Sequence, residues 1–139
     1  MDKEVRRELI LDNYQHPYHK GLKDDTSYIR ANTNNESCID NIDIQLKIEE
    51  GKVVDANFDG EACAISTSAT SIFMQKIIGK TVEELKELLE NYKHMIQEEA
   101  YDEELLEELV AYNEIYLQPN RKKCALLPAE TIEKILQQL

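Results

Sequence analysis

Several residue types that mark common protein classes are scarce in this sequence. Its 139 residues include four glycines, three prolines and no tryptophan. The few glycines form no phosphate-binding loop, and no serine stands in a local motif with the histidine and aspartate of a serine hydrolase. Nucleotide-dependent chemistry and serine-hydrolase chemistry are therefore set aside.

Long apolar runs and positive charge are also scarce. No apolar run approaches the ~20 residues of a membrane helix, and the charged segment Met1 to Arg7 does not resemble a signal peptide. We therefore expect a cytoplasmic protein with no membrane partner, in a compartment where thiols stay reduced. The net charge of -12 predicts no nucleic-acid partner, because phosphate backbones would be repelled. A partner with a basic surface fits this charge better.

The N-terminal half predicts one helix followed by three strands. Apolar residues at helical spacing indicate a helix from Lys3 to Tyr14, which ends before Pro17 because the residue before a proline avoids helical dihedrals. A brief strand is expected at Tyr28 to Ala31, and alternating apolar and polar residues indicate two antiparallel strands in segments 42–48 and 54–58. The residues expected on the buried face of these two strands are Ile42, Ile44, Leu46, Ile48, Val54, Ala56 and Phe58.

The C-terminal half predicts a series of helices. A helix rich in alanine and serine is expected from Ala62 to Ile78, and Thr81 opens a capping box for the next. Asp102 is expected to cap a further helix that carries the apolar residues of segment 105–110. Eleven of the 28 acidic residues lie in segment 83–108 in a helical pattern, which is typical of a solvated helix face.

A final helical pattern covers Arg121 to Leu139. Pro128 lies inside it, so the helix is expected either to kink there or to start afresh near Leu127. The order of elements predicts an α+β fold, in which a three-stranded antiparallel sheet is covered by about five helices. Residues 1–139 are expected to form one domain.

Three cysteines, Cys38, Cys63 and Cys124, stand apart from one another with no CxxC pair. Each falls at the end of a predicted element, where rigid elements can present side chains to a shared edge. Asp40 follows the first cysteine by two residues, so the set supplies three thiolates and one oxygen, the ligand count of a tetrahedral zinc site. The cations of segment 121–123 are expected to favour the thiolate of Cys124.

Two interpretations of the cysteines remain open at this point. A lone cysteine in a cytosolic protein is commonly a small buried apolar residue, whereas the polar loop around Cys38 and the cations before Cys124 favour a metal or thiol site. The three histidines lie beside no cysteine and are expected to be exposed and unpaired: His16, His19 and His94.

Four pieces of the chain, in this order, resemble one known family over nearly the whole length. The pieces are Leu11 to Pro17 with Lys20-Gly21, then Ser37-Cys38-Ile39-Asp40, then Phe58 to Ser66, and finally Arg121-Lys122-Lys123-Cys124-Ala125. They resemble the iron–sulfur cluster assembly proteins of the IscU, NifU N-terminal and SufU group. Lys123 stands where the IscU branch carries a histidine, and the long interval between Cys63 and Cys124 is similar to the SufU branch.

The resemblance implies a zinc-dependent sulfurtransferase that accepts persulfide sulfur from a pyridoxal-phosphate cysteine desulfurase of the SufS-like kind. It implies zinc ligation by Cys38, Asp40, Cys63 and Cys124. Cys38 is expected to accept the sulfur, and Arg121 to assist by steadying an anionic persulfide or orienting Cys124. Two alternatives stay open, a scaffold that builds a [2Fe–2S] cluster or binds iron on the same cysteines, and a structural zinc-binding interaction domain. Whether the chain is an enzyme is left open with them.

Three residues depart from the pattern of the family. Ile39 replaces the glycine between the first cysteine and the aspartate, and Glu107 and Glu114 stand where SufU-like chains tend to carry glycines. A β-branched residue resists the positive φ that glycine permits, so the Cys38 loop is expected to follow a different path or to have less freedom.

Overall fold

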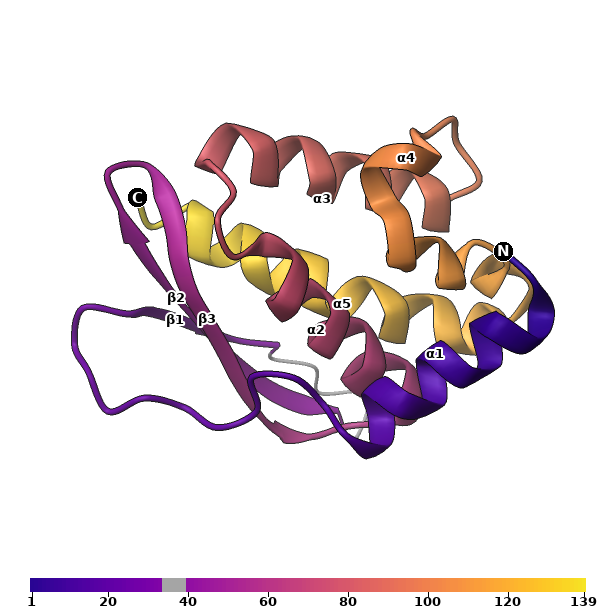
Figure 1. Ribbon diagram of the computed structural model, residues 1–139, viewed down its shortest axis with the longest axis horizontal. Coiled ribbons are helices and arrows are strands. Elements are labelled where there is room, and N and C mark those ends of the chain that lie inside the picture. Colours follow the sequence, from indigo (N-terminus) through magenta and orange to yellow (C-terminus); the bar gives the residue numbers. More distant parts are fainter. Residues whose placement is uncertain (34–39) are drawn as a thin grey trace.

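One small sheet and a larger set of helices make up the protein (Figure 1). The computed structural model describes residues 1–33 and 40–139, so the predictions for Cys38 and Ile39 lie outside the described residues. The described elements, with η for 3₁₀ helices, are α1 (Lys3–Gln15), β1 (Ile29–Asn32), β2 (Asn41–Glu49), β3 (Lys52–Glu61), α2 (Ala64–Ile77), α3 (Val82–Ile96), α4 (Glu103–Leu106), η1 (Glu107–Tyr112), η2 (Ile115–Leu117) and α5 (Pro119–Leu136). The predicted α+β class, with a three-stranded antiparallel sheet and five α-helices, is confirmed.

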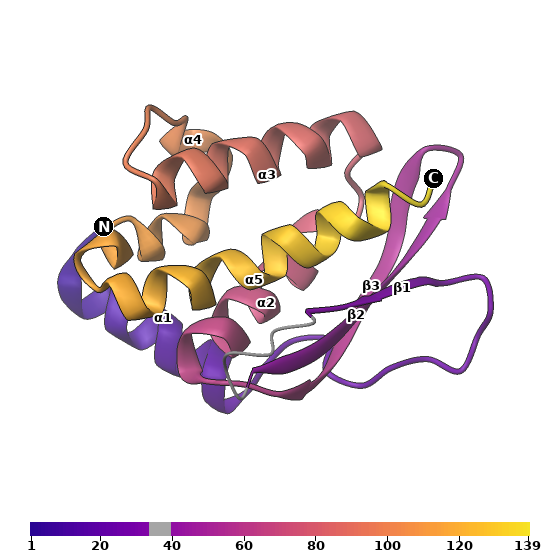
Figure 2. The same cartoon turned by 180° about the vertical axis from the view of Figure 1, so that it is seen from behind.

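The helices are stacked in layers over the sheet (Figures 1 and 2). The strand order is β1-β2-β3, and both neighbouring pairs are antiparallel. Helix α2 packs on β3, α5 packs on β1 and β2, and α3 packs on α5, while α1 runs along α2. Because β2 begins where β3 ends, the connection from β3 into α2 lies at the same end of the sheet as the start of β2.

The buried face of the sheet follows the predicted alternation at most positions but not at Val54. That side chain is 41% exposed, whereas Val53 beside it is fully buried. The cause is a shift of register, since Lys47 pairs with Asp55 while the next residue, Ile48, pairs with Val53. One extra residue in β3 reverses the alternation at that point, as in a β-bulge.

Local capping signals define several helix boundaries as predicted. Helix α1 extends one residue beyond the predicted Tyr14, and α2 lies within the expected range. The capping box at Thr81 is confirmed, because the Glu84 N–H donates to Thr81 Oγ1 at 3.1 Å and the Thr81 N–H donates to Glu84 Oε1 at 3.0 Å.

The helix expected over segment 105–110 is shorter than predicted. Asp102 does cap it, through hydrogen bonds from the N–H groups of Glu104 and Leu105, but α4 ends at Leu106. Glu107 then has φ +49° and ψ -117°, the dihedrals of a type II′ turn position that favours glycine, and the chain continues as the 3₁₀ helix η1. A glycine at this position would therefore match the backbone found here.

Pro128 lies inside a helix that does not start afresh beside it. Helix α5 runs from Pro119 to Leu136, so of the two predicted alternatives the structure excludes the new start near Leu127. The predicted beginning at Arg121 is also two residues late, because Pro119 occupies the first turn, where its missing N–H is not needed.

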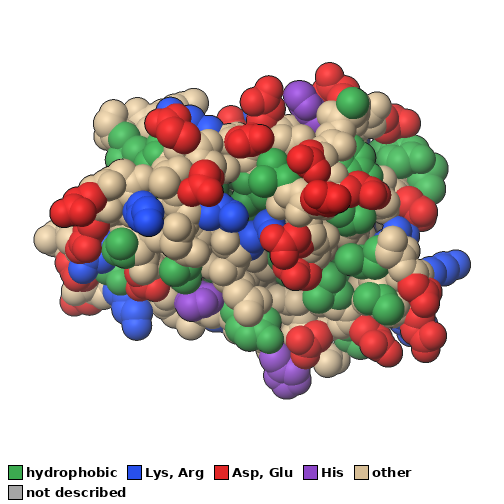
Figure 3. All heavy atoms as spheres, turned by 45° about the horizontal axis from the view of Figure 1, so that its top comes forward, with side chains coloured by type: hydrophobic (Ala, Val, Ile, Leu, Met, Phe, Trp, Pro, Cys, Tyr) green, Lys and Arg blue, Asp and Glu red, His purple; other side chains and the backbone are tan. Residues whose placement is uncertain are grey.

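Acidic side chains are spread over the face of the molecule on which α3 lies (Figure 3). Those of α3 that are exposed are Glu83, Glu84, Glu87 and Glu90. The predicted solvated acidic face is thus confirmed for this helix. Within residues 1–33 and 40–139, none of the helices has the length and apolar character needed to cross a membrane.

Candidate metal centre

Three of the predicted ligands meet at the end of the sheet where β2 begins. One ligand atom each from Asp40, Cys63 and Cys124 lie within 4.8 Å of one another. Asp40 directly precedes β2, Cys63 is the N-cap of α2, and Cys124 lies in the first half of α5. The fourth predicted ligand, Cys38, lies outside the described residues.

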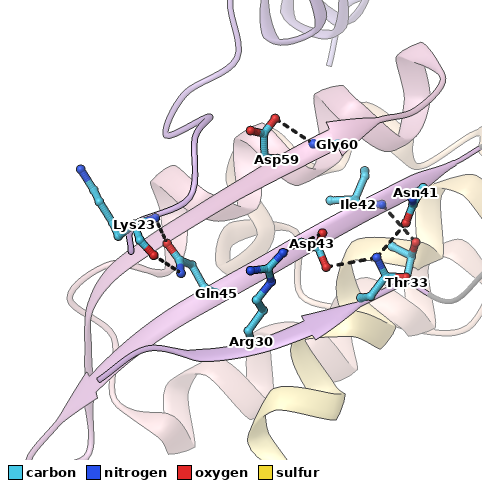
Figure 4. A network of polar contacts seen from close by, with 10 residues as sticks. Lys23, Arg30, Thr33, Asn41, Ile42, Asp43, Gln45, Asp59 and Gly60 are labelled. Atoms are coloured by element: carbon cyan, nitrogen blue, oxygen red, sulfur yellow. Dashed lines mark hydrogen bonds and ion pairs between the residues drawn. The ribbon is translucent and has the colours of Figure 1, made fainter. Parts of the chain in front are cut away.

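Figure 4 shows a polar junction between the end of β1 and the start of β2, in which Thr33 lies beside Ile42. This junction positions the backbone at Asp40. The Thr33 N–H donates to the Ile42 carbonyl at 3.0 Å, and the Ile42 N–H donates to Thr33 Oγ1 at 3.2 Å. The same Thr33 hydroxyl donates to the Asp40 carbonyl at 3.4 Å. These bonds hold the backbone of Asp40 against the end of β1.

Gly60 allows β3 to approach β2 closely just before Cys63. It has φ +132°, and a Cβ atom there would overlap the carbonyl oxygen of Asn41. A residue with a side chain would therefore push the two strands apart. The glycine keeps Asp40 and Cys63 at hydrogen-bonding distance.

The carboxylate of Asp40 is buried and hydrogen-bonded through both oxygens. Its exposed fraction is 2%; Oδ1 accepts the Cys63 N–H at 2.7 Å, and Oδ2 accepts the Ser66 hydroxyl at 2.8 Å. Burial acts to raise the pKa of Asp40, but these hydrogen bonds outweigh it and hold the pKa below its usual range. The group is therefore an oriented anion, which suits a cation ligand.

The thiol of Cys124 is also buried, with 6% of the residue exposed. Burial, together with the neighbouring Cys63 and Asp40, raises the pKa of Cys124 to about 12. The expectation that the adjacent cations favour its thiolate is wrong, because Arg121 and Lys123 are exposed whereas the buried thiol lies beside Cys63 and the Asp40 carboxylate. A divalent cation between the donors would reverse this direction by stabilising the thiolate.

Arg121 lies in the first turn of α5, exposed, and three residues before Cys124. Residues at this spacing lie on the same side of a helix, so the guanidinium can reach the neighbourhood of the site. His16 and His19 are exposed, as expected, and no histidine belongs to the group of donors among the described residues. The expectation that His94 is unpaired is wrong, because its Nε2 lies 4.0 Å from Glu90 Oε1.

Ser66 belongs to the site but was not singled out from the sequence. It is fully buried, its Oγ lies 2.8 Å from Asp40 Oδ2 and 3.0 Å from the Cys124 carbonyl, and its N–H donates to Cys63 Sγ at 3.5 Å. Its place three residues after the N-cap cysteine is the only local signal. That signal does not distinguish it from the other serines of α2.

The donor set fits zinc. Two thiols and a carboxylate are ligands that structural and catalytic zinc sites use, and three converging donors leave room for a fourth. Because cysteine binds zinc in its deprotonated form, both cysteines would bind it as thiolates. The interpretation of Cys63 and Cys124 as isolated core residues does not account for their shared carboxylate.

Comparison with known proteins places the chain in a family. Residues 5–137 match the family described as NifU-like N terminal domain, and the protein belongs to this family. The iron-sulfur cluster assembly scaffold protein IscU of Thermotoga maritima is 36% identical over 132 residues, which cover 95% of this chain and 92% of that protein. The zinc-dependent sulfurtransferase SufU of Bacillus subtilis is 34% identical over 129 residues, which cover 92% of this chain and 86% of that protein.

Solved structures agree with this assignment. A putative iron-sulfur cluster assembly scaffold protein for the SUF system from Fervidobacterium islandicum superposes with a TM-score of 0.80 at 29% identity, over 95% of this chain and 97% of that one. The N-terminal part of a NifU-like protein from Brucella abortus has the same fold, with a TM-score of 0.82 at 20% identity, over 94% and 91%. The family predicted from the four sequence pieces is therefore confirmed.

Proposed function

We propose that the protein is a zinc-dependent sulfur acceptor that takes persulfide sulfur from a pyridoxal-phosphate cysteine desulfurase for iron–sulfur cluster assembly in the cytoplasm. The observation that carries this proposal is the convergence of Asp40, Cys63 and Cys124 within 4.8 Å. The relative named zinc-dependent sulfurtransferase SufU, 34% identical, supports the same reading. Cys38 completes the proposed zinc ligand set.

The proposed transfer is a thiol–persulfide exchange. The thiolate of Cys38 attacks the outer sulfur of the donor's persulfide, a new S–S bond forms on Cys38, and the donor's cysteine leaves as a thiolate. Zinc supplies a way to keep a thiolate deprotonated and nucleophilic at neutral pH without redox chemistry of its own. No external oxidant or reductant is needed, because the sulfur moves at the oxidation level of the donor.

The described residues take separate parts in this proposal. Cys63 and Cys124 are held on helices and serve as fixed ligands, whereas Asp40 offers a harder oxygen ligand and is the one we expect to be exchanged when the partner docks. Once released, its carboxylate keeps two hydrogen-bond donors, the Cys63 N–H and the Ser66 hydroxyl. Arg121, exposed on α5, is proposed to steady the anionic persulfide.

A second candidate is a scaffold on which a [2Fe–2S] cluster is assembled or iron is bound. The relative named iron-sulfur cluster assembly scaffold protein IscU, 36% identical, supports it. Three thiolates and a carboxylate could hold such a cluster, although the set lacks the fourth cysteine of most [2Fe–2S] sites. A purely structural zinc site is the third reading, and metal identity and the reactivity of Cys38 separate the three.

Metal analysis and a desulfurase assay test the proposal together. We expect aerobically purified protein to hold about one zinc per chain. The chain should stimulate a cysteine desulfurase, and Cys38→Ala should abolish that stimulation. Bound iron with cluster absorption would favour the scaffold, and zinc without stimulation would favour the structural reading. If Asp40→Ala leaves the zinc affinity unchanged, the ligand assignment is wrong.

A further inference from the structure

One backbone carbonyl beside the site lacks its usual helical partner. In an α-helix the N–H of a residue bonds to the carbonyl four residues earlier, and proline has no N–H. Pro128 stands inside α5, so the carbonyl of Cys124 receives no such bond. The Ser66 hydroxyl, from α2, lies 3.0 Å from that carbonyl oxygen and provides the donor that the helix does not.

Ser66 also contacts the other two donor residues. Its Oγ is 2.8 Å from Asp40 Oδ2 and 3.6 Å from Cys63 Sγ, and its own N–H points at that sulfur from 3.5 Å. The side chain is completely buried, so water does not compete for these contacts. A single hydroxyl thus joins the three segments that carry the described donors.

The Ser66 hydroxyl has one proton to donate and two acceptor oxygens within hydrogen-bonding distance. Its proton can be donated to the Asp40 carboxylate or to the Cys124 carbonyl, and the second acceptor exists because Pro128 has removed the helical donor. Donation to Asp40 fixes the orientation of the carboxylate. Donation to the Cys124 carbonyl fixes the turn of α5 that carries the thiol.

We propose that Ser66 is the positioning residue of the metal centre and that Pro128 makes this possible by leaving the Cys124 carbonyl free to accept its hydroxyl. The proposal rests on the proposed metal-binding function. Groups that orient metal ligands without touching the metal typically change metal affinity about 10–100-fold when removed, and this is the loss expected for Ser66→Ala.

The matched control for Ser66→Ala is Ser68→Ala. Ser68 is buried on the same helix, but its Oγ pairs with the Tyr112 hydroxyl at 2.6 Å and donates to the Ile65 carbonyl at 3.2 Å instead of contacting a donor residue of the described site. Zinc affinity is measured by competition with a chromogenic chelator, and the geometry of the site by the ligand-field and thiolate charge-transfer bands of added Co²⁺. We expect Ser66→Ala to weaken zinc binding about 10–100-fold and to alter the Co²⁺ bands, and Ser68→Ala to do neither.

The double variant S66A/P128A separates positioning from stability. Residue 128 then has an N–H for the Cys124 carbonyl, so the double variant is expected to unfold at a higher temperature than Ser66→Ala, which also keeps the test usable if Ser66→Ala fails to fold. Oδ2 of Asp40 still lacks the Ser66 hydroxyl, so zinc affinity should stay up to about 10-fold below that of Pro128→Ala. Equal zinc affinity and equal Co²⁺ bands in S66A/P128A and P128A would overturn the positioning role while leaving the proposed function intact. If the unmodified protein binds no zinc, both fall.

Discussion

The backbone N–H of Cys63 donates a 2.7 Å hydrogen bond to Oδ1 of Asp40, across 23 positions of sequence. This bond joins the N-cap of α2 to the residue that precedes β2. It orients the carboxylate and the first cysteine of the described group before any cation binds. A site prepared in this way binds a metal with less loss of conformational freedom.

Cys63 and Cys124 should contribute more to zinc affinity than the carboxylate of Asp40 does. Thiolates are softer ligands than carboxylates and suit zinc well, so we expect Cys63→Ser and Cys124→Ser to lower zinc affinity by about 100-fold or more, and Asp40→Asn by about 10-fold. Chelator competition on the purified variants measures this order. A larger loss for Asp40→Asn than for either cysteine would contradict the proposal that Asp40 is the exchangeable ligand.

Gly60 should be essential for the junction of β2 and β3. Gly60→Ala combines a positive φ with overlap against the Asn41 carbonyl, and we expect it to lower the free energy of unfolding by about 2–4 kcal/mol. Gly79→Ala is the control, because Gly79 has φ +94° but nothing within 4 Å of the added Cβ, and it should lose only about 1–2 kcal/mol. Denaturant unfolding gives both values. Equal losses would show that the close approach of the strands is unimportant.

At position 107 a glycine variant should be more stable than an alanine variant, which is the reverse of the usual order. At most positions alanine is the more stable, but the dihedrals of Glu107 favour glycine, so Glu107→Gly should be more stable than Glu107→Ala by about 1–3 kcal/mol. Both variants lose the 2.8 Å ion pair with Lys76, so that loss cancels in the comparison. Thermal or denaturant unfolding measures the difference. An alanine variant at least as stable as the glycine variant would contradict the interpretation that the backbone at Glu107 is strained for residues other than glycine.

Tyr28 offers a pH test that does not involve the metal site. A hydrogen bond to Asp55, with burial and the charge of that carboxylate, raises the pKa of Tyr28 to about 12. A raised folded pKa contributes stability that is complete below the unfolded pKa of about 10 and is lost as the pH rises through about 12. Absorbance titration of the protein minus Tyr28→Phe isolates this tyrosine.

The role of Asp55 in raising the pKa of Tyr28 is tested by replacing its carboxylate with a neutral amide. Asp55→Asn should bring the Tyr28 titration down toward its ordinary value of about 10, because the amide carries no charge. Asp24→Asn, which changes an exposed aspartate nearby in the sequence, should leave the titration in place. If both variants shift Tyr28 equally, general charge rather than the hydrogen bond is responsible.

Several predictions that depended on neighbouring residues were confirmed. The helix before Pro17, the hairpin of alternating strands and the capping box at Thr81 are each encoded within a few residues, because period, turns and caps are local properties. The four family pieces added the site, since they place Asp40, Cys63 and Cys124 in one ligand set. Local pattern alone had left metal ligands and core cysteines as equal alternatives.

Errors arose where distant segments set the outcome. Val53 is buried in place of Val54 because the pairing of β3 with β2 shifts by one residue, and the pKa of Cys124 is raised because the fold buries its thiol beside Asp40. Helix α5 continues through Pro128, and the carbonyl left without a helical donor is satisfied by Ser66 from another helix.

The sequence by itself thus determined the fold class and the family, because these follow from periodicity and motifs along the chain, and it supplied the ligand set that is proposed here. Only the tertiary structure decided how the donors are oriented, which thiol is buried and which serine holds them together. Those properties depend on hydrogen bonds and burial between residues as far apart as Ser66 and Cys124, 58 positions in sequence, and no local pattern encodes such contacts.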